Sequence, residues 1–513
     1  MRAERPVRLR AWRWPLVTAQ LPALQVAIPL ACAPLCVLFR VRFVPWLLFV
    51  VAAVGSLVCA ALLAGRVASE GTVRYAMGDW RAPAGIEFVV SAFNTPVLLL
   101  VSLAATVTAG YARRSVAAEI EPRRRRLLYA CLCLTLAGLL GLAVTGDVFN
   151  AFVFLEISSL ATYTMIAMGQ HRRALLAAFR YVVIGTVGAV FVLIGIGLAY
   201  AVTGTLNMAD LAERLAEGHD NRALQAAVVF VFVGLAVKMA VFPLHAWLPG
   251  AYAEAPSVVS TFIAATGTKV AVYVFCRFAF TVFGAALVFG VLRIDRIGLA
   301  LAALAMLVGS AAACFQQDLR YLLAWSSVAQ IGYILAGVSL ATASGVSAAY
   351  LHLINHAVTK AALFAAAGLL VMQLGSVRLS ALAGLGRRMP WTFAAIVVAG
   401  LGLVGVPPTA GFVSKWALVT ALVERGMWPV LVAMLASSLL ALVYVGRIIE
   451  VVWFREPPAS AELEPTQSPA TPASMVAAIW FLVLLTVYFG IDPTFPGGLA
   501  DAAASALLGS GGE

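Results

Sequence analysis

Residues 178–203 read AFRYVVIGTVGAVFVLIGIGLAYAVT, a long apolar run in which Arg180 is the sole charged side chain. Roughly 20 mostly apolar residues are enough for an α-helix to cross the hydrocarbon core of a bilayer. The run is longer than that, and it lacks the alternation of polar and apolar residues that a β-barrel strand shows. Its backbone groups can be satisfied within lipid only in a helix, so the run predicts a membrane span.

The composition extends this prediction to the whole chain of 513 residues. Hydrophobic residues make up 63% and charged residues 11%, against about 45–50% and 25% in ordinary globular proteins. So little polar material cannot coat a water-soluble surface of this size, which excludes a cytosolic enzyme, a disordered chain and a secreted disulfide scaffold. The net charge of +12 comes almost entirely from arginines in short connectors, where they meet water and lipid headgroups rather than nucleic acid. We therefore expect an all-α, multi-pass membrane protein.

The same length criterion, applied along the chain, predicts about fourteen spans. Their ranges are 20–39, 44–64, 88–110, 127–146, 148–168, 178–203, 224–243, 257–276, 297–315, 322–341, 345–373, 391–421, 428–453 and 474–491. The apolar stretch 278–292 is an additional short or re-entrant candidate, and the segment 457–474, rich in Pro, Glu and Thr, is expected to be a polar loop.

Two of these spans contain prolines close to a lysine. GLAVKMAVFPLHAWLPGAYAEAPS (234–257) places Pro243 after Lys238, and GLGLVGVPPTAGFVSKWAL (400–418) places two prolines before Lys415. Proline removes a backbone donor, so helices seven and twelve are expected to be broken. Broken helices in corresponding halves indicate a transporter with two inverted five-helix repeats. The expected division is 1–126 (helices 1–3), 127–276 (first repeat), 277–456 (second repeat) and 457–513 (polar loop and helix 14).

Ionisable side chains at bilayer depth are costly, about 2.5–3.5 kcal/mol each on insertion scales, and so are functional candidates. The candidates for proton transfer are Glu156, Lys238, Lys269, His352, His356, Lys360 and Lys415, with His245 and Glu254 as secondary candidates beside the break in helix seven. An isolated buried lysine loses its proton unless a carboxylate stabilises the ammonium form. Glu156 is the acid deep inside a preceding span, so it is expected to pair with Lys238. A static buried ion pair is the alternative interpretation.

His352, His356 and Lys360 are spaced i, i+4 and i+8, which places them on one narrow stripe of a helix. Histidine titrates near neutrality and can pass protons between its two ring nitrogens. Zinc binding is an alternative for this spacing, as is a packing role for one histidine, but no HExxH pattern or third ligand accompanies it. The seven cysteines lie in apolar stretches without CxxC spacing, and GxGxxG at Gly400–Gly405 follows no strand. No metal or cofactor is therefore expected.

Four stretches together resemble a family of proton-conducting, antiporter-like membrane subunits. They are TGDVFNAFVFLEISSLATY (145–163), VKMAVFPLHAWLPGAYAEAPSVVSTFIAATGTKVAVYVF (237–275), DLRYLLAWSSVAQIGYILAG (318–337) and HLINHAVTKAALF (352–364). The family includes the D subunit of Mrp-type cation/proton antiporters, the antiporter-like subunits of respiratory complex I and their relatives in membrane-bound hydrogenases.

The resemblance implies a fourteen-helix core with a polar, water-assisted axis near the membrane midplane, inside a multi-subunit complex. By position, Glu156 and Lys238 match the family's coupling pair and Lys269 its bridging residue. His352 and His356 match the central histidine region, and Lys415 the terminal residue. A lysine at 415 differs from the complex I subunit that carries an acid there.

The leading hypothesis is a proton-translocating subunit of a cation/proton antiporter, with Na⁺ or K⁺ as counter-ion and other membrane subunits as partners. The resemblance implies a bacterial or archaeal-type cell (inner) membrane as its location. The alternative is a proton-pumping membrane arm of a complex I-like NADH-quinone oxidoreductase or a membrane-bound hydrogenase, with the redox chemistry on other subunits. No catalytic motif in this chain decides whether that complex is an enzyme. A structural scaffold with inert buried charges is the third interpretation.

Overall fold

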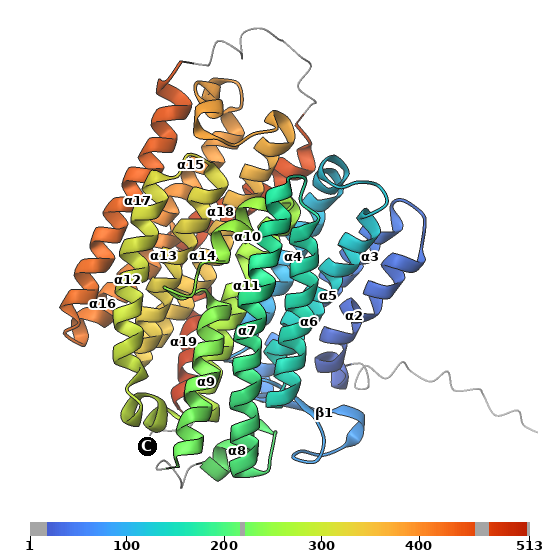
Figure 1. Ribbon diagram of the computed structural model, residues 1–513, viewed down its shortest axis with the longest axis vertical. Coiled ribbons are helices and arrows are strands. Elements are labelled where there is room, and N and C mark those ends of the chain that lie inside the picture. The colour runs from blue at the N-terminus through green and yellow to red at the C-terminus, as the bar shows by residue number, and fades with distance from the viewer. Residues whose placement is uncertain (1–17, 216–220, 457–470, 510–513) are drawn as a thin grey trace, which may run out of the picture.

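The computed structural model describes residues 18–215, 221–456 and 471–509. Within these residues, thirteen helices are long and apolar enough to cross a membrane, and they lie side by side with their axes along the long direction of the molecule (Figure 1). They are α2 (Leu21–Leu38), α3 (Val44–Glu70), α4 (Thr95–Glu119), α5 (Arg125–Val144), α6 (Val148–Ala167), α7 (Arg172–Thr203), α9 (Arg222–Met239), α11 (Ser257–Cys276), α12 (Ile294–Phe315), α13 (Leu319–Ser339), α14 (Ala343–Leu374), α17 (Trp428–Phe454) and α18 (Ala473–Ile491).

The remaining predicted span is two shorter helices, α15 (Pro390–Val404) and α16 (Ala410–Glu424). Gly405 between them has φ +88°, a left-handed conformation that ends α15, and two prolines follow it. The other predicted break also occurs: α9 stops at Met239, and a short helix α10 (Leu248–Glu254) follows. The membrane architecture and both breaks are thus confirmed.

Some boundaries and small elements differ from the prediction. The span expected at 88–110 starts too early, because Glu87–Val90 (β2) pairs antiparallel with Val73–Ala76 (β1) and α4 begins after this hairpin. Two short helices were not predicted, α8 (Met208–Leu215) and α19 (Thr494–Leu508). The stretch 278–292 forms π-helical turns, η2 (Arg277–Val282) and η3 (Ala286–Val291), and short 3₁₀ turns are η1 (Met77–Asp79), η4 (Leu379–Leu382) and η5 (Leu385–Arg387). Most of the predicted polar loop, 457–470, lies outside the described residues.

Burial divides the helices into a centre and a periphery. In the most apolar window of both α11 and α13, 94% of the residues are buried, against 39% in α7 and α12. Figure 1 shows α11, α13 and α14 in the middle of the bundle, between α2 and α3 at one edge and α16 and α17 at the other. The lysines and histidines at 269, 352, 356 and 360 lie on α11 and α14, so they are enclosed by protein rather than lipid.

Two connections between helices are built in the same way. Val148 N–H donates to Leu206 O (2.9 Å) and Met208 N–H to Gly146 O (2.8 Å), which ties the α5–α6 turn to the segment after α7. The α12–α13 turn and the segment after α14 have the matching bonds, Leu319 to Val377 (3.0 Å) and Leu379 to Gln317 (2.8 Å). Each donor and acceptor residue of the first connection thus has its counterpart in the second connection 171 residues further along the chain.

The same spacing recurs in the helices themselves. Asp147 and Asp318 both cap a helix, accepting from Asn150 N–H (2.7 Å) and Arg320 N–H (2.9 Å). Burial raises the pKa of each carboxyl. The hydrogen bonds that each carboxyl accepts from backbone N–H groups oppose this shift. The helices α7 and α14 both have 32 residues, and each ends at a glycine with positive φ. The caps, the helix lengths and the terminal glycines therefore match at positions 171 residues apart.

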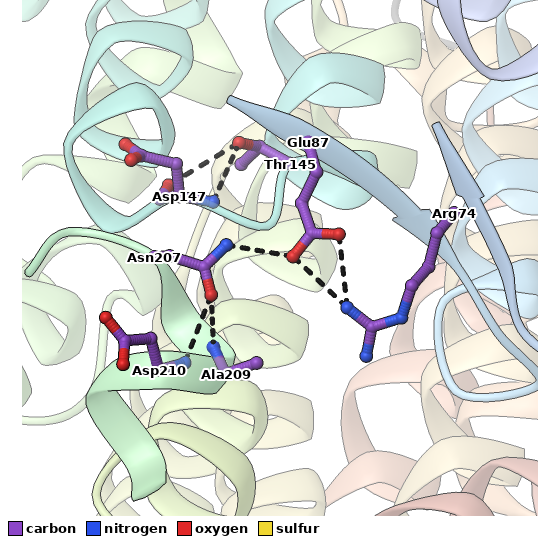
Figure 2. Close-up of polar contacts among 7 residues, drawn as sticks. All are labelled: Arg74, Glu87, Thr145, Asp147, Asn207, Ala209 and Asp210. Atoms are coloured by element: carbon purple, nitrogen blue, oxygen red, sulfur yellow. Dashed lines mark hydrogen bonds and ion pairs between the residues drawn. The ribbon is translucent and has the colours of Figure 1, made fainter. Parts of the chain in front are cut away.

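The β-hairpin docks on the first of these connections through Glu87 (Figure 2). The Glu87 side chain is buried and accepts from Asn207 Nδ2 (2.8 Å), while Arg74 Nη1 lies 3.1 Å from its carboxylate. Asn207 in turn accepts from the backbone N–H groups of Ala209 and Asp210 at the start of α8. One buried carboxylate therefore holds together the hairpin and the connection before α8.

Replacing Glu87 by Ala is expected to destabilise the protein by about 2 kcal/mol, because the buried Asn207 amide then lacks its acceptor. Glu87→Gln keeps an acceptor oxygen and is the matched control, with a smaller loss. Thermal unfolding of the purified protein, followed by tryptophan fluorescence, measures both. An unchanged midpoint in Glu87→Ala would show that the hairpin is not held by this carboxylate.

Candidate functional site

The expected pair between α6 and α9 is present. Lys238 Nζ lies 3.5 Å from Glu156 Oε1, and it also donates to Ser159 Oγ (2.9 Å) and Tyr163 OH (3.3 Å). The lysine side chain is 6% exposed and the glutamate 22%. Glu156, Ser159 and Tyr163 lie on one face of α6 at i, i+3 and i+7, so a single helix supplies all three oxygens around the ammonium.

The neighbourhood of Lys238 opens towards α11. A cavity of about 50 Å³ is lined by Lys238, Ser159 and Thr162 on one side and by Thr266 and Gly267 of α11 on the other. One water molecule needs roughly 10–15 Å³ of such space together with polar partners, so the cavity can hold water between Lys238 and α11. Lys269 is one turn or less from both α11 residues, and it is fully buried.

Lys269 has no acidic partner among the described residues. Its Nζ donates to Ala264 O (2.5 Å) and to Thr268 Oγ1 (3.4 Å), both on its own helix. It interacts electrostatically with His352, His356 and Lys360 of α14, which we call the α14 stripe. Lys269 therefore lies on the helix that borders the Lys238 cavity and interacts with the buried side chains of α14.

The α14 stripe is buried along its whole length, and its members differ in their partners. His352 Nε2 lies 2.8 Å from Gln330 Oε1 and its Nδ1 lies 3.0 Å from Ser414 Oγ, which bridges α13, α14 and α16. The ring of His356 lies parallel to that of His352, with centroids 6.1 Å apart. Lys360 turns to α13 and donates to Leu323 O (2.7 Å) and Ser326 Oγ (2.5 Å).

His356 is the one member of the stripe whose two ring nitrogens find no hydrogen-bond partner among the described residues. A buried polar group without a partner costs roughly 1–3 kcal/mol, so such groups usually have a role beyond packing. His356 lies between His352 and Lys360 and interacts electrostatically with both, and with Lys269.

Lys415 lies at the far end of the series, beside the break between α15 and α16. Its Nζ donates to Leu403 O (2.7 Å), Val404 O (3.0 Å) and Ser438 Oγ (3.0 Å), and it lies 4.7 Å from the centroid of the Tyr333 ring. The Tyr333 ring also stacks on His352, with centroids 5.4 Å apart. Tyr333 thus joins Lys415 to the α14 stripe.

The two secondary candidates lie outside this series. The His245 ring stacks on Phe242 (5.2 Å) and meets Trp325 edge-on (5.1 Å), which is an aromatic packing site. Glu254 accepts from Tyr321 OH (2.9 Å) and lines a cavity of about 540 Å³ with Glu119, Arg320 and Arg378. Among the described residues, no hydrogen bond or ion pair joins either side chain to a buried lysine.

Several side chains that complete the site were not singled out in the sequence. They are Ser159, Tyr163, Ser326, Gln330, Tyr333, Ser414 and Ser438, all neutral donors or acceptors next to a lysine or histidine. Helical spacing from Glu156 could have indicated Ser159 and Tyr163. Each of the others meets a lysine or histidine of a different helix, so helical spacing does not indicate them. No group of three or more residues able to hold a metal ion occurs within residues 18–215, 221–456 and 471–509.

The chain is similar to known membrane subunits over nearly its whole length. Residues 145–441 match the family model described as NADH:quinone oxidoreductase/Mrp antiporter, transmembrane. The N subunit of the NADH-quinone oxidoreductase of Desulforudis audaxviator is 41% identical, covering 93% of this chain and 96% of the relative. The D subunit of the Na⁺/H⁺ antiporter of Bacillus subtilis is 30% identical, covering 94% and 96%.

The fold is also shared with a solved antiporter complex. A chain of the Mrp complex from Dietzia sp. superposes with a TM-score of 0.87 at 27% identity, covering 96% of this chain and 98% of the other. The sequence resemblance is confirmed by a family match over more than half of the chain and by a relative 41% identical. This chain belongs to the NADH:quinone oxidoreductase/Mrp antiporter family of transmembrane subunits.

Proposed function

We propose that this protein is the proton-translocating subunit of a multi-subunit cation/proton antiporter in the cell membrane. The observation that carries the proposal is the Glu156–Lys238 pair inside the membrane, continued by buried basic groups to Lys415. Protons would pass from Lys238 through Lys269 to the α14 histidines and Lys360, and on to Lys415. The likeness to the Mrp fold and to the Na⁺/H⁺ antiporter relative supports this assignment.

The physical requirement for such a path is a proton affinity that can be switched. The Glu156 carboxylate stabilises the ammonium form of Lys238, and moving it by a few ångströms would favour release of the proton. Glu156 is partly exposed at the side of α6, so a neighbouring subunit could displace it. A static ion pair would not need an exposed glutamate, and both of its side chains would be expected to be fully buried.

The matched connections support the division into two repeats, 127–276 and 277–456. Each unit would contain five spans, one of them broken, and an odd number of spans reverses the direction in which the second unit starts. The two units are then related by inversion, which places both breaks, and with them Lys238 and Lys415, near the same membrane depth.

A second candidate is favoured by the relative named for NADH-quinone oxidoreductase. The chain would then be the membrane arm of a redox-driven complex and would move protons by the same path. The two functions differ in what drives the protons.

Proton movement by the intact complex in proteoliposomes distinguishes them. An antiporter subunit is expected to move protons when a Na⁺ or K⁺ gradient is imposed without an electron donor. Proton movement that needs electron transfer to a quinone or another acceptor would support the second candidate. A complex that moves no protons in either assay would contradict both.

A further inference from the structure

The ammonium of Lys415 is held by a complete set of oxygens. Its three N–H donors are matched by Leu403 O, Val404 O and Ser438 Oγ at 2.7 to 3.0 Å. The side chain is 6% exposed, and Gly405 leaves room for it, since a Cβ there would lie 2.9 Å from Lys415 Cδ. We call Leu403 O, Val404 O and Ser438 Oγ the oxygen cage.

The sequence leaves the two carbonyls of the cage without helical partners. In a continuous helix, Leu403 O and Val404 O would accept from the N–H groups four residues on, which belong to Pro407 and Pro408. Proline has no N–H, so both carbonyls must find another donor. They also lie at the C-terminus of α15, where the helix dipole concentrates partial negative charge. The double proline therefore leaves two carbonyls at the end of α15 without helical donors, and Lys415 Nζ donates to both.

The other buried lysines do not have this environment. Lys269 and Lys360 donate to Ala264 O and Leu323 O, which lie inside helices and already accept from the chain four residues on. Lys238 is held by a carboxylate and two hydroxyls. A neutral amine at Lys415 has two N–H groups for the three oxygens of the cage, so deprotonation leaves one of these buried oxygens without its donor.

We propose that the oxygen cage is a binding site for an alkali cation, Na⁺ or K⁺, for which the Lys415 ammonium competes. Oxygen ligands suit these cations, and unwound helix ends with free carbonyls bind Na⁺ in transporters. An ammonium group is close to K⁺ in size, so K⁺ fits the cage nearly as it stands, whereas Na⁺ requires it to contract. The inference rests on the proposed antiport function and names the site of its counter-ion.

The competition couples the two ions one for one. When Lys415 passes its proton towards His352, the neutral amine loses one donor and its charge, and a monovalent cation can take its place between the same oxygens. The charge within the cage is then unchanged. Among the described residues, the titratable groups facing Lys415 are His352 and His356 on α14 and Tyr333 on α13; Tyr444 on α17 faces Tyr333, and α15 carries none.

Equilibrium binding of ²²Na⁺ and ⁸⁶Rb⁺, the latter as a K⁺ probe, to the intact purified complex tests the proposal over a range of pH. In the wild type, one proton is expected to be released per cation bound, and the apparent affinity to rise about tenfold per pH unit while Lys415 is protonated. Lys415→Ala should bind the cation at low pH without this proton release. Ser438→Ala, which removes one ligand but keeps the lysine, should bind several-fold more weakly and still release the proton.

Two further variants keep the test decisive if Lys415→Ala fails to assemble or if transport is lost for another reason. If Lys415→Ala does not assemble, Lys415→Gln can donate to both carbonyls and should block cation binding at every pH. Lys238→Ala should keep cation binding and proton release while transport is lost, which separates this inference from the proposed function. The oxygen cage would be overturned as the cation site if the cation affinity of Lys415→Ala kept the wild-type pH dependence. It would also be overturned if cation binding changed only in Lys238→Ala.

Discussion

Replacing Lys269 by Met is expected to reduce cation-driven proton flux by at least about 100-fold, the usual contribution of a positioned proton-transfer group. Lys269 is the fully buried link between the Lys238 cavity and the α14 histidines. Methionine has a similar length but binds no proton, so the series would be interrupted at one point. The measurement is proton flux through the reconstituted complex, followed with a pH-sensitive dye under a Na⁺ or K⁺ gradient.

The same variant is expected to be at least as stable as the wild type. Lys269 has no acidic partner among the described residues, and a buried amine carries a desolvation cost that a thioether does not. Loss of flux together with an unchanged or higher unfolding temperature would therefore assign Lys269 to transport. Full flux in Lys269→Met would exclude it from the path, and the alternative of an inert buried charge would hold at this position.

Replacing Glu156 by Gln is expected to lower the flux by about tenfold or more while the complex still assembles. The amide keeps a hydrogen-bond acceptor near Lys238 but removes the charge that stabilises its ammonium form. Lys238 would then hold its proton less often, and the coupling step would lack its switch. Cation-driven proton flux and complex assembly are measured on the same preparation.

Glu156→Asp is the matched variant. It retains the charge on a side chain shorter by one methylene, so it should recover part of the flux that Glu156→Gln loses. His245→Phe is the control for a buried titratable group outside the series, because it preserves aromatic packing against Phe242 and Trp325. Equal flux in Glu156→Gln and the wild type would leave the pair as a static structural contact.

Much of the fold follows from residue type alone. Hydrocarbon accepts long apolar runs only as helices, so the spans were predictable, and Pro243 and the 407–408 pair marked both breaks. The hairpin at 73–90 was not predictable by the same rule. Its strands are four residues each, and it docks on the rest of the chain through Glu87 and Asn207, which is 120 residues away in the sequence.

The site divides in the same manner. Charge at bilayer depth is rare enough that every lysine and histidine of the series could be identified from its position, and the pairing of Glu156 with Lys238 followed from the need to keep a buried lysine charged. The separate surroundings of His245 and Glu254 could not be foreseen, because both lie beside the same break as Lys238. Only the three-dimensional arrangement shows that they face aromatic rings and a separate cavity.

The most direct test of proton transfer along this series is the proton flux of the Lys238→Ala complex under a cation gradient, compared with wild-type complex at equal incorporation. We expect that flux to fall to the level of empty vesicles while subunit composition stays the same. Wild-type flux in that variant would contradict the proposed path, because protons would then cross the membrane without the residue on which the whole series depends.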